Sequence, residues 1–379
     1  MQIPSIMKNF NASILWLATL TVTVAFTACQ KTDNTDYTVP TTYDFANVDY
    51  SGQTARIMML EELATYAKSA NTPSQPQLSA LTMEYMYENN KVNGNPFTNP
   101  DLATETKQIK DKVEANAQAS FVNYMNALEV ASQNTAMSAS AGQAGIATDN
   151  NGNTYLLNEN GLELAQLLEK GLAAACMYYQ ASTVYLGPTK MNVDNKAVID
   201  GKGTNMEHHW DEAFGYFGAP KDFPANTSNL DLWAKYSNKV SPSIGSNTKI
   251  MNAFLKGRAA ISAEDYDTRD EMIAVARQEW ELVLAAVAIS YINDAKRAGS
   301  DWAASYHYLT EAYAFIMGIQ YGANPKINQA DLNTILENLA GSANPLSANF
   351  YNVTAQKMDA AINALAATYT ELEAVKASL

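Results

Sequence analysis

The chain has 379 residues, and its 39 Asp and Glu against 25 Lys and Arg give a net charge of −14. An acidic surface of this size argues against nucleic acids and anionic lipid headgroups as partners. Alanine, leucine and methionine are abundant while strand-like alternation is scarce, so the composition predicts a mostly helical body.

The first 28 residues are typical of an export signal. Lys8 supplies positive charge, residues 14–26 are mostly apolar, and Phe26-Thr27-Ala28-Cys29 resembles a bacterial lipobox. This pattern predicts that Cys29 is lipidated and anchors the protein to the outer membrane, on its periplasmic side or at the cell surface. The alternative is a plain cleaved signal in which Cys29 is incidental. A transmembrane anchor is disfavoured, because the apolar run is shorter than the ~20 residues that a span needs.

The mature chain is expected to begin with a tether. Residues 29–45 are polar and poor in core-forming side chains, which favours a flexible segment. Residues 46–379 then form one all-helical domain. Cys176 lies in the apolar run LAAACMYY and has no partner other than the lipidation residue, so we expect a buried thiol and no disulfide framework.

Apolar residues at helical spacing, with caps and breakers, predict most of the secondary structure. The predicted helices are 54–70, a short piece within 78–88, 99–132, 161–187, 208–218, a short piece within 230–237, 248–261, 266–298, 301–318, 329–339 and 349–378. Asn151-Gly152 favours a hairpin turn. The Asp and Asn residues around it match a calcium loop poorly, since Asn160 stands where such a loop has glutamate.

The second half of the chain is similar to the first. TKIMNAFLKGRAAI, from Thr248, matches TARIMMLEELATY, from Thr54, and HHWDEAFGYFG has a copy in HYLTEAYAFIMG. A shift of 99 positions places His208 on His307 and Glu212 on Glu311. We therefore predict an all-α fold of two pseudo-repeated helical bundles packed together, with halves at about 46–220 and 245–379.

The two His/Glu pairs are the candidate site. Residues four apart lie on one helix face with Cβ atoms about 6 Å apart, so His208 with Glu212, or His307 with Glu311, could share a metal or a proton. If the two bundles bring the pairs together, the ligand set suits zinc, iron or manganese. His209 could replace or supplement His208. The alternative is that each pair is a structural hydrogen bond at the bundle interface.

Other polar residues carry weaker signals. Glu279 and Glu281 flank Trp280 on a core helix and could reach an interior site, while Arg258 is expected to form a structural ion pair rather than to hold an anionic ligand. Asp265 and its acidic neighbours are expected to cap a helix. Gln180 is stranded among apolar residues and needs a hydrogen-bond partner. HExxH, G-x-S-x-G and glycine-rich phosphate motifs are absent.

His209-Trp210-Asp211-Glu212 resembles the HxxE motif of the imelysin-like lipoproteins, an exported all-helical family in which the motif lies between two related bundles. That likeness is distant, because Glu207 occupies the position of a family glycine. HHWDEAFGYFG followed by HYLTEAYAFI is more similar to a family of bacterial lipoproteins with a domain of unknown function. These resemblances imply a helical envelope protein connected with metal acquisition. Imelysins were named as peptidases, and the residues here do not imply that activity.

The sequence thus favours a lipid-anchored binding protein over an enzyme. The expected site lies between the two bundles and holds a divalent metal such as zinc or iron, or a small ligand, through His208, His209, Glu212, His307 and Glu311. One alternative is a metal-dependent hydrolase that uses the same groups, with a glutamate as general base. The other is a structural or partner-binding lipoprotein without a small-molecule site.

Overall fold

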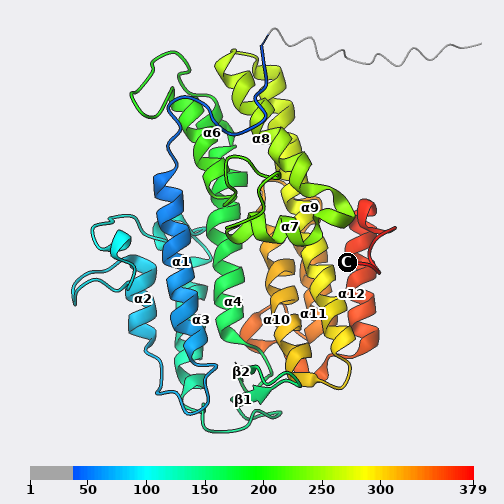
Figure 1. Ribbon diagram of the computed structural model, residues 1–379. Coiled ribbons are helices and arrows are strands. Elements are labelled where there is room, and N and C mark those ends of the chain that lie inside the picture. Colours follow the sequence, from blue (N-terminus) through cyan, green and yellow to red (C-terminus); the bar gives the residue numbers. More distant parts are fainter. Residues whose placement is uncertain (1–36) are drawn as a thin grey trace, which may run out of the picture. The chain divides into compact units, whose positions relative to one another are not determined.

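A computed structural model of the protein describes residues 37–379. The predicted signal segment and Cys29 lie outside the described residues. The described part is mostly helical, with one antiparallel two-stranded hairpin, which confirms the expected helical class (Figure 1). Within it, no helix combines the length and the apolar character that crossing a bilayer requires.

The helices mostly follow the predicted segments. The α-helices are α1 (Ser51–Ser69), α2 (Ala80–Glu88), α3 (Gln118–Ser132), α4 (Leu164–Leu172), α5 (Pro188–Met191), α6 (Asn205–Gly215), α7 (Leu232–Ile244), α8 (Ser246–Ser262), α9 (Tyr266–Ala298), α10 (Trp302–Gly318), α11 (Gln329–Ala340) and α12 (Ala355–Thr368). A π-helical segment, η3 (Ala173–Tyr185), continues α4 without a break. The hairpin consists of β1 (Gly145–Thr148) and β2 (Thr154–Leu157), which confirms the predicted turn at Asn151-Gly152.

The long helix α9 forms the centre of the fold. It packs against α8 and α10 along much of its length and also contacts α7 and α12. Residues 282–289 are all buried, so this stretch faces the core on every side. Helix α4 lies between α1 and α10 and contacts both, while α6 packs against η3 and α8 (Figure 1). The helices α6 and α8 lie at the end of the bundle opposite the β1–β2 hairpin.

Side-chain caps fix where the helices of the candidate site begin. Helix α6 starts with a capping box, in which Thr204 Oγ1 accepts a hydrogen bond from Glu207 N and Glu207 Oε2 accepts one from Thr204 N. Asp265 caps α9 and Asp301 caps α10. The cap expected at Asp265 is therefore confirmed.

The long helix predicted for residues 99–132 is wrong in its first half. Pro100–Leu102 and Lys110–Lys112 form single 3-10 turns, η1 and η2, and α3 begins only at Gln118. Carbonyl groups that a helix would use internally accept bonds from other segments instead. Lys91 Nζ binds the carbonyl oxygens of residues 102, 103 and 105, and Arg56 Nε binds that of Gln108. Tertiary hydrogen bonds here outweigh helix propensity.

Two further boundaries differ from those expected. The tether was predicted to extend to residue 45, but Tyr43 is fully buried and its hydroxyl donates to Asp211, so the folded body begins earlier. The last helix was predicted over 349–378, whereas α12 covers only Ala355–Thr368. The chain leaves helical geometry at Tyr369, whose hydroxyl donates to the buried carboxylate of Glu281.

Glycine allows α6 and α8 to approach closely. A Cβ on Gly257 of α8 would lie 2.1 Å from the Trp210 ring, and Trp210 Nε1 donates to the carbonyl of Phe254 one turn earlier. Trp210 is fully buried, so the ring has no alternative position near the surface. This contact fixes how α6 sits on α8.

We expect Gly257→Ala to destabilise the protein by about 1–3 kcal/mol, because the added methyl group must displace a packed indole. The measurement is chemical denaturation followed by circular dichroism. Gly52→Ala is the matched control, since its Cβ would meet the flexible end of Lys107 at 3.3 Å and Arg56 Nη1 at an ordinary contact distance of 3.6 Å, and alanine favours the helix. Equal stabilities of the two variants would contradict the close packing of Trp210.

Candidate functional site

The two predicted His/Glu pairs lie at opposite ends of one helix. His307 of α10 bonds to Glu163, the residue at the start of α4, whereas Glu212 of α6 bonds to Tyr185 at the end of η3. The continuous helix α4–η3 contains 9 and then 13 residues, which separates its ends by on the order of 30 Å. The structure therefore does not bring the pairs together into the expected His2Glu2 site.

Glu212 is the centre of the α6 cluster. Its carboxylate accepts hydrogen bonds from Gln53 Nε2 at 2.9 Å and from His209 Nδ1 at 3.0 Å, and the Tyr185 hydroxyl also bonds to it. Burial raises the pKa of Glu212, but these hydrogen bonds outweigh burial and bring the pKa below its usual value. The carboxylate is thus ionised and held from three sides.

His208 and His209 have different roles in this cluster. His209, three residues before Glu212, makes the short contact, while His208 Nε2 lies 3.9 Å from the same carboxylate. The Nδ1 atom of His208 is buried without a hydrogen-bond partner. Burial lowers the pKa of His208, so its neutral form is favoured. His208 therefore has hydrogen-bonding capacity that the protein itself does not use.

A cavity of about 370 Å³, here called the α6 cavity, opens beside this cluster. Its lining includes His208, Glu212, Gln53 and Tyr185. The remaining lining is strongly charged, with the cations Arg56, Lys107, Lys112 and Lys202 and the carboxylates Asp49 and Asp111. The cavity thus joins the start of α1, the η2 turn, the end of η3 and α6.

The α10 cluster is a closed charge network. His307 Nδ1 lies 2.6 Å from Glu163, whose side chain is fully buried and also accepts a hydrogen bond from Asn71. Tyr155 stacks on the His307 ring with centroids 4.6 Å apart. His307 Nε2 is 3.8 Å from Glu311, so its main partner is Glu163, 144 residues away in sequence.

Lys170 compensates the second carboxylate of this cluster. Its ammonium lies 3.3 Å from Glu311 and 2.7 Å from Glu169, and Lys68 also pairs with Glu169. The Tyr291 hydroxyl bonds to Glu311 as well. Every charged group in this cluster therefore has an opposite charge beside it, as buried ions require. A structural role accounts for the α10 cluster.

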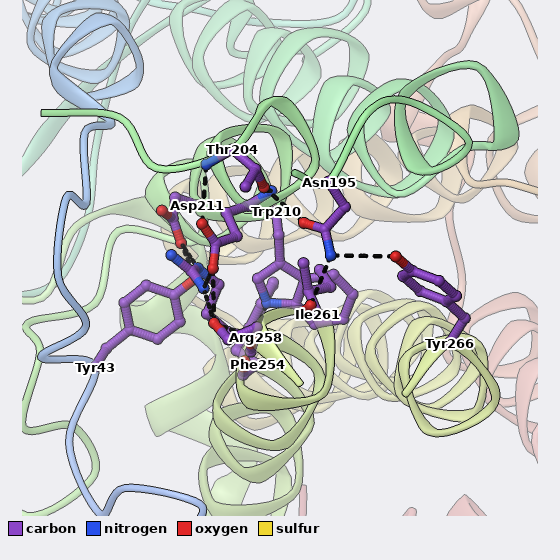
Figure 2. A network of polar contacts seen from close by, with 11 residues as sticks. Tyr43, Asn195, Thr204, Trp210, Asp211, Phe254, Arg258, Ile261 and Tyr266 are labelled. Atoms are coloured by element: carbon purple, nitrogen blue, oxygen red, sulfur yellow. Dashed lines mark hydrogen bonds and ion pairs between the residues drawn. The ribbon is translucent and has the colours of Figure 1, made fainter. Parts of the chain in front are cut away.

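Arg258 of α8 pairs with two carboxylates of α6, Glu207 and Asp211. The guanidinium is buried and bonds through Nε to Asp211 at 2.9 Å and through Nη1 to Glu207 at 2.6 Å. Tyr43 from the entering segment donates to Asp211 at 2.7 Å, so three segments meet at this point (Figure 2). The structural ion pair expected for Arg258 is confirmed.

Another cavity, of about 440 Å³, lies beside α9 and contains Glu279 and Glu281 in its lining. The Glu281 carboxylate accepts hydrogen bonds from the Tyr369 hydroxyl and from Lys326 N, both at 2.7 Å. Burial raises the pKa of Glu281 despite these bonds. Glu281 thus reaches the interior as expected, in a different place from the histidines.

Several residues of these clusters were missed in the sequence. The unrecognised partners are Gln53, Arg56, Glu163, Lys170 and Tyr185. Lys170 carried a usable signal, because a lysine between apolar residues of a core helix needs a buried counter-charge. Among residues 37–379, no three His, Cys, Asp or Glu side chains are grouped so as to hold a metal ion. Whether either pair takes part in metal binding stays a prediction.

The environment of His307 makes stability depend on pH. Burial disfavours the imidazolium, but the hydrogen bond and charge of Glu163 outweigh burial and raise the pKa of His307 above 6.5. The resulting stabilisation is complete below the unfolded pKa and is lost as pH rises through the folded pKa. We expect the stability difference between wild type and His307→Asn, which keeps a donor near Nδ1, to shrink as pH rises through neutrality.

The measurement is the free energy of unfolding as a function of pH. His208→Asn serves as the comparison, because the pKa of His208 is shifted in the opposite direction. Protonation of this histidine therefore destabilises the folded protein, and only as pH falls below about 6.5. Parallel pH profiles for wild type and His307→Asn would contradict the His307–Glu163 ion pair.

Comparisons with known proteins address the family and not the activity. Neither the curated proteins nor the solved structures that were searched contain a match. A family model described as a domain of unknown function, DUF4856, matches residues 40–370, which include both His/Glu pairs and nearly all of the described helices. The chain therefore belongs to the DUF4856 family, a domain of unknown function.

Proposed function

We propose that this protein is a lipid-anchored binding protein of the cell envelope whose small ligand occupies the α6 cavity. The observation that carries the proposal is the combination, in one cavity, of an oriented carboxylate, Glu212, with an unsatisfied imidazole, His208. A buried polar atom without a partner is costly, and a turn of the part-exposed His208 ring that presented Nδ1 to a ligand would remove that cost.

A binding role agrees better with this geometry than hydrolysis does. The Glu212 carboxylate already accepts hydrogen bonds from Gln53, His209 and Tyr185. A general base needs a free lone pair directed at a water or substrate proton. The distant likeness to imelysin-like lipoproteins rests on His209 and Glu212, and here these two residues bond to each other.

We also propose that the two halves arose by duplication. In both pairs the histidine Nε2 stands at a similar distance from its glutamate, 3.9 Å for His208–Glu212 and 3.8 Å for His307–Glu311. In both, a tyrosine from the long helix of the same half bonds to the glutamate, Tyr185 from η3 and Tyr291 from α9. In this proposal the two copies then diverged. The α6 pair lies beside an open cavity, whereas the ammonium of Lys170 lies beside the glutamate of the α10 pair.

Ligand capture tests the binding function. We expect native mass spectrometry of the full chain, purified without a polyhistidine tag, to find a small molecule or metal ion bound with unit stoichiometry. His208→Gln should reduce its occupancy severalfold, because the variant loses a hydrogen bond worth about 1 kcal/mol to the ligand. His307→Asn, at the other end of α4–η3, should leave occupancy unchanged.

Elemental analysis of the same samples reports whether the species is a metal or contains one. Equal occupancy in wild type and His208→Gln would move the binding site elsewhere. The protein could also be found without a ligand, both when purified from its native envelope and after incubation with an envelope extract. That result would favour a purely structural role for both His/Glu clusters.

The anchor is tested separately. Cys29→Ser should move the protein from the membrane fraction to the soluble fraction, because a lipidated cysteine supplies most of the membrane affinity of such a protein. Cys176→Ser is the matched control: Cys176 is a buried thiol, as expected, and has no role in anchoring. Membrane association that survives loss of Cys29 would contradict the lipid anchor.

A further inference from the structure

We infer that the ligand of the α6 cavity carries an oxyanion, a carboxylate or a phosphate group, that pairs with the buried guanidinium of Arg56. The inference rests on the proposed binding function and specifies the chemistry of what is bound. It is drawn from the charges that line the cavity and from the contacts that each of them makes.

Arg56 is buried without a close counter-charge. Its side chain is only 4% exposed and lines the cavity. Two donors are used by backbone carbonyls, Nε by Gln108 at 2.7 Å and Nη1 by Gly52 at 3.2 Å. The Nη2 group makes no hydrogen bond within the described residues, and its nearest carboxylate, Asp111, is half exposed and 3.8 Å away.

The other buried arginine of this region shows what full pairing looks like. Arg258 is 2% exposed and has two carboxylates, Glu207 at 2.6 Å and Asp211 at 2.9 Å. Removing a guanidinium from water without an opposite charge costs several kcal/mol, so buried ions are normally paired. Arg56 is almost as buried but has no carboxylate within hydrogen-bonding distance. An anion in the cavity would supply the missing counter-charge.

Three lysines extend the positive charge around the cavity. Lys112 has no ion pair within residues 37–379, and the nearest carboxylates to Lys107 and Lys202 are 3.6 and 3.9 Å away. These contacts are looser than a bonded ion pair, so the ammonium groups keep donors for a ligand. A small oxyanion can bind several such donors at once.

The start of α1 adds backbone donors to the same cavity. Helix α1 has 19 residues, no acidic residue in its first turn and no side-chain cap. Asp49 accepts the N–H of Ser51 at 3.0 Å, while Gly52, the next residue, lines the cavity and brings a first-turn N–H without a helical partner. Helix starts of this kind bind phosphates and carboxylates.

The carboxylates of the lining do not cancel this charge. Glu212 is already bonded to three donors, and Asp49 accepts two hydrogen bonds from Ser51 and lies 3.9 Å from the ammonium of Lys202. Asp111 stands at the exposed rim. Arg56 and the lysines therefore remain the charged groups of the lining with unused bonding capacity, which selects an anionic ligand.

The test is isothermal titration calorimetry of the full chain with inorganic phosphate and with citrate, at constant ionic strength, with glycerol as the neutral probe. We expect at least one anion to bind and glycerol not to bind. Lys112→Gln should weaken binding by about threefold to fivefold, as loss of one exposed charge contact does. Arg56→Lys should weaken it by roughly tenfold or more, because the forked donor pair is lost.

Lys221→Gln is the control, since Lys221 pairs with Asp44 outside the cavity and should leave affinity unchanged. Lys112 is partly exposed, so its variant should fold even if Arg56→Lys does not. The inference is overturned if neither anion binds at millimolar concentration, or if Lys112→Gln binds as wild type does. A neutral ligand whose capture depends on His208 would also overturn it, while leaving the proposed binding function intact.

Discussion

The buried ion pair of Arg258 with Asp211 determines how the α6 site is presented. Asp211 and Trp210 are held against α8, the first by Arg258 and the second by the slot at Gly257. Successive residues of a helix point about 100° apart. Because Asp211 and Trp210 face α8, the next residue, Glu212, points in a different direction. Breaking a buried ion pair by removing one partner costs about 3–5 kcal/mol, which is a large part of a typical folding free energy.

The same local motif has two outcomes in this chain because its surroundings differ. Beside α10 the buried Lys170 pairs with Glu311, and Glu163 accepts a hydrogen bond from His307 Nδ1, so each charged group of this cluster has a partner. Beside α6 the Glu212 carboxylate is bonded to Gln53, Tyr185 and His209, and the nearby lysines and Arg56 belong to the cavity wall. A closed network stabilises the fold, whereas an open one leaves donors for something else.

The sequence was sufficient for elements that depend on local pattern. The bounds of α9 and α10, the cap at Asp265 and the turn at Asn151-Gly152 follow from apolar spacing and from capping and turn residues. The buried partner required by Gln180 is present as well, the carbonyl of Lys112 at 2.8 Å. Each of these features can be predicted from residues close together in sequence, or from burial alone.

The arrangement of the site was not predictable in the same way. Periodicity places His307 and Glu311 on one helix face but does not say which part of another helix that face meets, so Glu163 was invisible. His209 and His208, three and four residues before Glu212, are both within reach of it on the helix surface. Only tertiary packing decides that His209 makes the short bond. Residues 99–117 lost their predicted helix because Arg56 and Lys91 bind their carbonyl groups.

An anion site in a chain of net charge −14 is physically consistent because charge acts locally. At physiological ionic strength the screening length is about 8 Å, so carboxylates on distant surfaces scarcely reach the α6 cavity. Within that distance the balance is set by Arg56, the three lysines and three carboxylates, of which Glu212 and Asp49 are already engaged and Asp111 is half exposed. The acidic surface would still slow the approach of an anion, which leaves affinity to the short-range hydrogen bonds. Arg56 is suited to supply them, since Gly52 and Gln108 hold its guanidinium in place before any ligand arrives.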